Sequence, residues 1–528
     1  MRIRNFIYGT LCSIGVLFAL NGCASSSNAQ NKESEKMEKS FTITEMQELT
    51  AMKATKFINE NNPIVLHKFT ADPAVLVYKD TVYVYGTNDM QQLEYNKGKS
   101  NNGYGQINSL NVFSSKDLVN WTDCGTIAVA GRDGAAKWAR NSWAPAVCWK
   151  NINGKDKFFI YFADSANGIG VISADSPLGP FEDPRGSALI SRQTPNTQGV
   201  YWLFDPAVLI DDDGTGYLYY GGGHQDKTPE DISNPKSARC VRLTDDMIEI
   251  DMKPVQIEPP FLFEDSGINK INGKYYYSYC TNWADRKNFP DADPAAVIGY
   301  MVSDDPLGPF EYKGYTLKNP GVYFGAYGNN HHWIFQFKDK WYIAYHAQFT
   351  EKALGLKGND GKEVGGYRSI IISDFKINDD GSLPIQSATK AGVEATQNFN
   401  PYEKVPAATM HSSKKIAVND LKEGVVGATI TQQQKIIPVE DGAYIALKNV
   451  DFSEGASSIT IKTAAGSGEG TLKMFADQAN SGELMAEIAI KGDGTFEAPV
   501  TLPAGDKVRT VYFTFKGNFA LVEWKINK

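Results

Sequence analysis

The stretch KDKWYIAY (338–345) joins a polar turn to a short strand rich in aromatic residues. Four other stretches repeat this design: KDTVYVYG (79–86), KDKFFIYF (155–162), GTGYLYYG (214–221) and NGKYYYSY (272–279). Turn residues followed by β-branched and aromatic residues are typical of β-strands. Recurrence roughly every 60 residues, with room for further strands in between, is typical of propeller blades. The repeat therefore predicts a five-bladed β-propeller.

The composition of the whole chain agrees with an all-β fold. Of its 528 residues, 12% are aromatic and 48 are Gly, which suit strands and turns respectively. Asp plus Glu total 61 and Lys plus Arg total 53, so the net charge is −8. An acidic chain without a long basic run is a poor binder of phosphate backbones. We therefore expect neither a helical bundle nor a nucleic-acid partner.

The last third of the chain has a different pattern. From about Ala407 the repeat stops, and short alternating strands follow at 444–450, 458–464, 471–477 and 510–517. Regularly spaced short strands with glycine turns indicate a β-sandwich. The predicted organisation is a five-bladed β-propeller at 46–400 followed by a β-sandwich (jelly-roll) module at 401–528.

The N-terminus has the features of an export signal. Two arginines precede an apolar run from residue 6 to 20, which is short for a membrane span. The run ends in LNGC, which resembles the lipobox of bacterial lipoproteins, whose Cys is lipidated. This resemblance implies a signal peptide at 1–22, a lipidated Cys23, a flexible tether at 23–45 and a lipid anchor in the bacterial cell envelope. A plain signal peptide is the alternative.

The other cysteines do not form a recognisable site. They are widely spaced and contain no C-x-x-C pair: Cys124, Cys148, Cys240 and Cys280. This pattern fits neither a zinc site nor a dense disulfide framework. Buried free thiols are the expectation.

Polar residues stand at a similar register before the five aromatic strands. The preceding motifs are ADPAV (71–75), WAPAV (143–147), FDPAV (204–208), FEDSG (263–267) and NNHHW (329–333). One position from each motif yields Asp72, Ala144, Asp205, Glu264 and His331. Because the innermost strand of each blade lines the central channel, we expect these positions to converge at one end of it.

Each of these residues also has an ordinary structural interpretation. Asp before Pro is often a turn former, and a lone Glu beside a strand is usually solvated. The similar spacing favours a shared site instead. Ala144 shows that the backbone does not require a carboxylate at this position. Two or three carboxylates around a pocket suit glycoside hydrolysis, in which one carboxyl is protonated and another ionised.

The motifs ADPAV, FDPAVLIDDDG, FEDSGINKINGKYYYSY and GNNHHWIFQFKDKWYIAYH resemble glycoside hydrolase family 43 in residues and order. The resemblance implies a five-bladed propeller and an inverting mechanism. By motif, Asp72 matches the general base, Asp205 the carboxylate that modulates the acid's pKa, and Glu264 the general acid. His331 matches the residue that contacts a central ion, usually calcium and largely water-coordinated. No organic cofactor is implied.

Three further residues are candidates for binding sugar. Arg368, in YRSIIIS (367–373), resembles the family's sugar-binding Arg, although a strand-edge ion pair is an alternative. Trp143 and Phe204 directly precede two channel positions. Each of them is a candidate for stacking on sugar, and a place in the core is the alternative for each.

The C-terminal module resembles carbohydrate-binding module family 6 over residues 444–477. It departs from that pattern because AATMHSS (407–413) lacks the usual Glu and Phe496 stands at the late Trp position. It keeps Asn518 and Trp524. A purely packing role for this module therefore stays open.

The leading hypothesis is an inverting exo-glycosidase that removes pentoses from plant hemicellulose, above all an α-L-arabinofuranosidase acting on arabinoxylan. A β-xylosidase of the same family is the nearest alternative. A non-catalytic surface glycan-binding lipoprotein is a second class, because fold alone does not determine function. A retaining fructan-active enzyme with Asp72 as nucleophile is a third.

Overall fold

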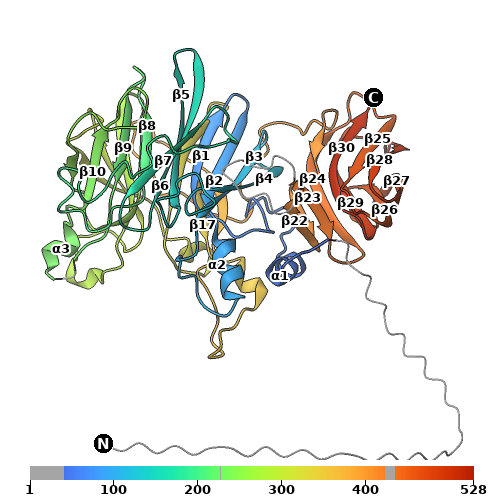
Figure 1. Ribbon diagram of the computed structural model, residues 1–528, viewed down its shortest axis with the longest axis horizontal. Helices are drawn as coiled ribbons and strands as arrows, with labels where there is room; N and C mark the ends of the chain where they lie inside the picture. Colours follow the sequence, from blue (N-terminus) through green and yellow to red (C-terminus); the bar gives the residue numbers. More distant parts are fainter. Residues whose placement is uncertain (1–40, 226, 422–433) are drawn as a thin grey trace, which may run out of the picture. The chain divides into compact units, whose positions relative to one another are not determined.

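The computed structural model describes residues 41–225, 227–421 and 434–528 (Figure 1). These described residues belong to one compact unit. The predicted signal peptide, Cys23 and most of the predicted tether lie outside them. In the described part of the chain, no helix is both long and apolar enough to cross a membrane. The helices are short: α1 (Glu45–Lys53), α2 (Asp89–Asn96), α3 (Pro229–Ser233), α4 (Gly321–Phe324), η1 (Arg286–Asn288) and η2 (Glu351–Leu354).

Five antiparallel sheets follow one another along the first three quarters of the chain. Blade 1 contains β1 (Ala71–Tyr78), β2 (Thr81–Thr87), β3 (Ser109–Ser115) and β4 (Trp121–Ala128). Blade 2 contains β5 (Trp143–Ile152), β6 (Lys155–Ala163) and β7 (Ile169–Ala174). Blade 3 contains β8 (Ala207–Ile210), β9 (Gly216–Tyr220), β10 (Ala238–Arg242) and β11 (Val255–Ile257).

Two more sheets complete the set. Blade 4 contains β12 (Leu262–Ile271), β13 (Lys274–Thr281), β14 (Ile298–Ser303) and β15 (Glu311–Leu317). Blade 5 contains β16 (His332–Phe337), β17 (Lys340–Ala347) and β18 (Ser369–Asp374). The first strands contact one another in the order β1, β5, β8, β12, β16 and back to β1. This closed ring of inner strands confirms the predicted five-bladed propeller.

The aromatic strands of the sequence repeat are the second strands of the blades, namely β2, β6, β9, β13 and β17. Successive side chains of a strand point to opposite faces, so each blade fills the space toward both neighbours. Tyr219 packs toward blade 4 and Tyr220 toward blade 2, for example. Tyr276 and Tyr277 divide in the same way between blades 5 and 3. Continuous aromatic runs are therefore expected, because both faces of the strand are buried.

The first and last blades close the ring in the same manner. Val84 of blade 1 and Tyr342 of blade 5 belong to one buried cluster. The segment before β1 also runs along β18: Ile64 donates its backbone N–H to the Ile370 carbonyl at 3.0 Å. The four described cysteines are free and buried, as the sequence predicted.

The C-terminal strands form two facing sheets, which confirms the predicted all-β sandwich. One sheet contains β22 (Ile416–Asp420), β23 (Gln434–Pro438), β30 (Leu521–Asn527), β25 (Ser458–Thr463) and β28 (Gly494–Pro499), with β19 (Val405–Pro406) paired to β30. The other contains β21 (Ser412–Lys414), β24 (Ala443–Asp451), β29 (Val508–Gly517), β26 (Glu469–Ala476) and β27 (Glu483–Lys491). The short strand β20 (Thr409–Met410) belongs to neither sheet and pairs with β4 of blade 1.

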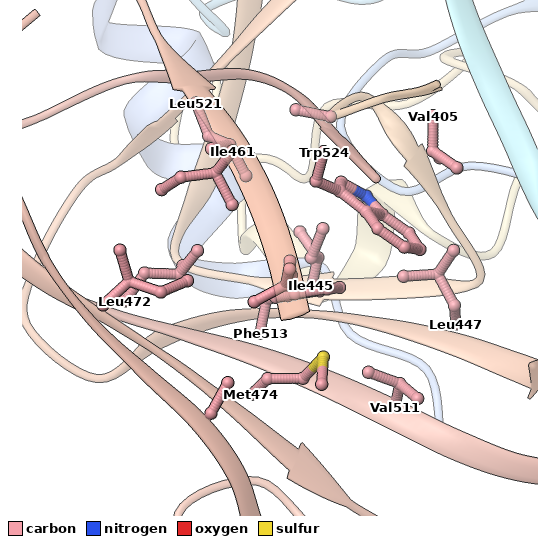
Figure 2. Close-up of a cluster of buried hydrophobic side chains, with 14 of the residues drawn as sticks. Val405, Ile445, Leu447, Ile461, Leu472, Met474, Val511, Phe513, Leu521 and Trp524 are labelled. Atoms are coloured by element: carbon pink, nitrogen blue, oxygen red, sulfur yellow. The ribbon is translucent and has the colours of Figure 1, made fainter. Parts of the chain in front are cut away.

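Side chains from both sheets make the sandwich core, which Figure 2 shows around Trp524 and Phe513. Trp524 is 2% exposed and its ring centroid lies 5.0 Å from that of Phe513. Phe496 is partly buried and packs against the same core. Trp524 therefore acts in packing and does not present a stacking face for sugar.

Candidate active site

The inner strands bring the predicted residues to one pocket of about 330 Å³. Asp72 is the second residue of β1, Asp205 precedes β8, Glu264 lies in β12 and His331 precedes β16. All seven residues predicted for the propeller site line this pocket: Asp72, Asp205, Glu264, Trp143, Phe204, Arg368 and His331. Six of the seven are buried and Trp143 is partly exposed, which fits an enclosed site.

The backbone at the channel positions adopts an unusual conformation. Asp72, Ala144 and Asp205 have φ angles of 49°, 37° and 48°, where non-glycine residues are strained. Two of these positions are held by hydrogen bonds to the neighbouring blade, which is blade 5 for Asp72 and blade 1 for Ala144. The Asp72 N–H donates to His346 Nδ1 at 3.1 Å, and the Ala144 N–H donates to Thr87 Oγ1 at 2.9 Å. The strain therefore occurs where blades are tied together around the channel.

In blade 4 this strained position is Asp265, with φ 71°, and not Glu264. The strand pairing agrees, because the β-bulge of blade 4 lies between Glu264 and Gly267. That of blade 2 lies between Trp143 and Ala146. Glu264 thus occupies the position of Trp143, one residue before the position that the sequence register assigned to it. The bulge turns Glu264 into the pocket and leaves Asp265 beneath it.

Asp265 is a structural link that the sequence register missed. Its N–H donates to Asp205 Oδ2 at 3.0 Å, and its carboxylate accepts the His332 N–H at 3.1 Å. His332 Nδ1 also lies 2.5 Å from Asp265 Oδ2, and its Nε2 lies 2.7 Å from Ser278 Oγ. These contacts connect blades 3, 4 and 5 directly below the pocket.

His331 lies between the carboxylates. Its Nδ1 is 3.4 Å from Asp72 Oδ1, and its Nε2 is 3.4 Å from both Asp205 Oδ2 and Glu264 Oε1. Burial lowers the pKa of His331, but Asp72, Asp205 and the other nearby carboxylates outweigh it and raise that pKa well above its usual value. An imidazolium at this point offsets part of the charge of the acidic cluster.

Asp72 is held in its ionised form. Burial alone would raise the pKa of Asp72, but Arg368, His331 and His346 hold it well below its usual range. Arg368 Nη1 donates to Asp72 Oδ1 at 2.8 Å. Burial lowers the pKa of His346, and its Nε2 lies 2.9 Å from the Asn329 carbonyl. A neutral His346 that donates from Nε2 can accept the Asp72 N–H at Nδ1.

Asp205 has the opposite electrostatic environment. Burial raises its pKa well above the usual range; Glu264 and Asp72 raise it further, while His331 opposes the shift. Ligand atoms of Asp205, Glu264 and His331 all lie within 4.8 Å of one another. The proton that burial keeps on Asp205 therefore lies beside Glu264. The site thus combines an ionised Asp72 with a protonated Asp205.

The same three residues are a candidate cation site. Glu264 Oε1 is buried and has no hydrogen-bond partner among the described residues, so it has a free acceptor. Calcium takes six to eight oxygen ligands, more than this set supplies, so water would have to complete the shell. Below the pocket the channel narrows to a cavity of about 10 Å³, large enough for one water, and Trp333 lines it.

Other pocket residues were not identified from the sequence. Tyr104 and Trp202 add aromatic walls, and Thr87 and Asn329 add polar groups. Trp143 Nε1 donates to the Tyr104 carbonyl at 3.1 Å, and the Trp202 ring lies 5.3 Å from that of Phe204. Thr87, Tyr104 and Trp202 stand in loops or strand ends outside the motifs before the repeated strands, so no periodic signal marks them. Asn329 belongs to the motif NNHHW but lies two residues before the position that was selected from it.

Known proteins share this arrangement of sequence and fold. The model of the family described as glycosyl hydrolases family 43 matches residues 61–383. An arabinoxylan arabinofuranohydrolase of Paenibacillus polymyxa is 43% identical over 88% of this chain and 73% of its own length. One of Bacillus subtilis is 42% identical over 89% of this chain and 91% of its own length.

A solved structure agrees with these sequence relatives. The crystal structure of a glycoside hydrolase family 43 arabinoxylan arabinofuranohydrolase from Bacillus subtilis, in complex with cellotetraose, superposes with a TM-score of 0.83 at 41% identity. The match covers 91% of this chain and all of that one. Together with the ring of five blades, these matches show that the chain belongs to glycosyl hydrolase family 43.

Proposed function

We propose that this protein is an inverting glycoside hydrolase that releases α-L-arabinofuranosyl side chains from arabinoxylan. The observation that carries the proposal is the convergence of Asp72, Asp205 and Glu264 from three blades on one pocket. The names of two relatives that match nearly the whole chain support the substrate class. The β-xylosidase alternative has weaker support, because a relative of that name is 29% identical over only 53% of the chain.

Asp72 is proposed as the general base. It is ionised across the working pH range, and its carboxylate lines the pocket. It approaches His331 Nδ1, whereas Glu264 approaches Nε2 of the same ring. This places base and acid at different nitrogens of one imidazole. An inverting mechanism needs roughly 6.5–9.5 Å between the two carboxyl groups, to leave room for a water molecule.

Glu264 is proposed as the general acid and Asp205 as the carboxylate that keeps its proton available. The proton held by Asp205 lies beside Glu264. Glu264 can pass a proton to the leaving oxygen, because its Oε1 has no competing hydrogen bond among the described residues. Asp205 is fixed in turn by the N–H of Asp265. The resulting roles are those expected from two carboxyl groups in unlike environments.

The walls of the pocket favour a single terminal sugar. A volume of about 330 Å³ is at the small end of ligand sites, and aromatic side chains enclose it. Trp143, Phe204 and Trp202 offer apolar faces, while Arg368 offers N–H donors to hydroxyl groups. The cavity below has room for about one water molecule. These features support removal of side chains or chain ends over cleavage within a long chain.

A calcium ion is proposed beside His331, with Asp205 and Glu264 as the nearest carboxylates and water as the remaining ligands. When bound, the ion would take the place of the proton on His331, because only a neutral imidazole can contact a cation, and it would supply positive charge to the acidic cluster. The protein's own residues perform the proton transfers described above.

Hydrolysis of arabinoxylan, followed by NMR of the first-formed arabinose, tests the proposal. Inverted anomeric configuration is expected, whereas retention, or a covalent sugar trapped on Asp72, would support the fructan-type mechanism. Parallel assays with aryl arabinofuranoside and aryl xyloside separate the two pentosidase activities. Binding of glycans without turnover on any aryl glycoside would favour a non-catalytic surface protein.

We also propose that Cys23 is lipidated and anchors the protein in the bacterial cell envelope, on the strength of the LNGC motif and the polar stretch after it. Labelling with a fatty acid in cells should depend on Cys23, and Cys23→Ala should abolish it. The resemblance of the sandwich to carbohydrate-binding module family 6 stays a prediction. Its buried Trp524 supports the packing role.

A further inference from the structure

Asp89 is a buried carboxylate that the proposed reaction leaves without a role. It is the first residue of α2 and is 0% exposed. Its Oδ2 accepts Arg368 Nε at 2.9 Å, and its Oδ1 accepts Nη2 of the same side chain at 2.8 Å. Oδ2 also accepts the backbone N–H of Arg368 at 3.0 Å. One carboxylate thus fixes both the main chain and the side chain of this arginine.

The backbone around Arg368 is anchored as well. The N–H groups of Gly366 and Tyr367 donate to Glu351 at 3.2 and 2.6 Å. The Arg368 carbonyl accepts the Thr70 N–H at 2.8 Å, two residues before Asp72. Three consecutive backbone N–H groups therefore donate to buried carboxylates. We infer that the position of the Arg368 side chain matters for the site.

The position of Arg368 matters because of the shape of its guanidinium group. Arginine prefers to bind a carboxylate through two parallel hydrogen bonds from one edge. Asp89 occupies the edge formed by Nε and Nη2 and thereby fixes the plane of the guanidinium. In this orientation Asp72 receives one bond, from Nη1 to Oδ1. His331 and His346 also approach Oδ1, at 3.4 and 3.3 Å. Oδ2 of Asp72 is then left for a water molecule.

We propose that Asp89 is a positioning residue for the general base. By holding Arg368, it prevents a two-bond pair between Arg368 and Asp72 that would occupy both oxygens of the base. The inference rests on the proposed function, because it assigns Asp72 the activation of water. Asp89 touches no substrate atom and acts through Arg368 alone.

A double-mutant cycle tests this role. In Asp89→Asn, which keeps size but accepts fewer hydrogen bonds from Arg368, kcat on an aryl arabinofuranoside should fall about 10²-fold, as for an angstrom-scale misplacement. KM should change less than kcat, because the aromatic walls of the pocket still contact the sugar even where Arg368 has moved. In an Arg368→Lys background, Asp89→Asn should cost less than about threefold more, because residues acting through each other are not additive.

A matched control is available in blade 1. Asp123 is a buried carboxylate outside the pocket, 2.7 Å from both His67 Nε2 and Lys68 Nζ. Asp123→Asn should lower the melting temperature and leave kcat unchanged. If Asp89→Asn does not fold, Asp89→Glu keeps the charge, suits the start of a helix and displaces the guanidinium, and it enters the same cycle.

Wild-type kcat in Asp89→Asn, or a full additional loss in the Arg368→Lys background, would overturn the role of Asp89. Either result leaves the proposed function intact, because the wild-type enzyme still releases arabinose. Absence of turnover by the wild-type enzyme on arabinofuranosides is the separate outcome that overturns the function.

Discussion

Glu264→Gln removes the proton-donating group and the charge of this side chain while keeping its size. Gln has the same size as Glu, and Glu264 Oε1 makes no hydrogen bond among the described residues, so packing is preserved. The variant cannot donate a proton to a leaving oxygen. General acid catalysis contributes about 10²- to 10⁴-fold. On arabinoxylan oligosaccharides, kcat/KM should therefore fall by that factor, or about 3–5 kcal/mol of transition-state stabilisation.

The assay compares these oligosaccharides with a nitrophenyl arabinofuranoside, whose phenolate leaves with little help. The loss on the aryl substrate should be less than about tenfold, because a phenolate leaves with little help from a general acid. The pH profile adds a second readout. Wild-type activity should fall at high pH, where the proton that burial keeps on Asp205 is lost. The variant should lack this basic limb on the aryl substrate. Equal losses on both substrates would refute the assignment of Glu264 as the acid.

The other predictions concern Asp72, the candidate cation site and the core of the sandwich. Asp72→Asn should lose activity equally on both substrates, because water activation precedes either leaving group. Because the pKa of Asp72 is lower in the folded than in the unfolded state, its stabilisation is present above about pH 4 and lost below it. The wild-type advantage in melting temperature over Asp72→Asn should therefore shrink on acidification, and an unchanged gap would contradict the pairing. Calcium added after chelation should raise the melting temperature of the wild type and not of His331→Ala, and an equal rise in both would place the ion elsewhere. Trp524→Ala should cost about 3–5 kcal/mol in urea unfolding of the sandwich, whereas a cost below about 1 kcal/mol would mean that the core rearranges around the cavity.

Several parts of this structure were available from the sequence. The aromatic repeat defines the second strand of every blade, because a strand buried on both faces reads as a continuous apolar run. Polar residues upstream of each repeat, such as Asp72 and His331, share a register because equivalent strands line one channel. This periodicity let Asp72, Asp205 and His331, hundreds of residues apart, be assigned to one pocket before any coordinates.

The register of blade 4 and the hydrogen bonds between blades were decided only by the tertiary structure. A β-bulge shifts register by one residue without any mark in the repeat, so only the strand pairing shows that Asp265 and not Glu264 takes the strained position. Asp89 and Arg368 are separated by 279 positions and by no period, so their bonds depend on how blades 1 and 5 close the ring. The sequence by itself determined the five blades and the carboxylates, through periodic burial. The hydrogen bonds that orient them across blade boundaries, and the pKa values that follow, exist only once the ring is closed and water is excluded.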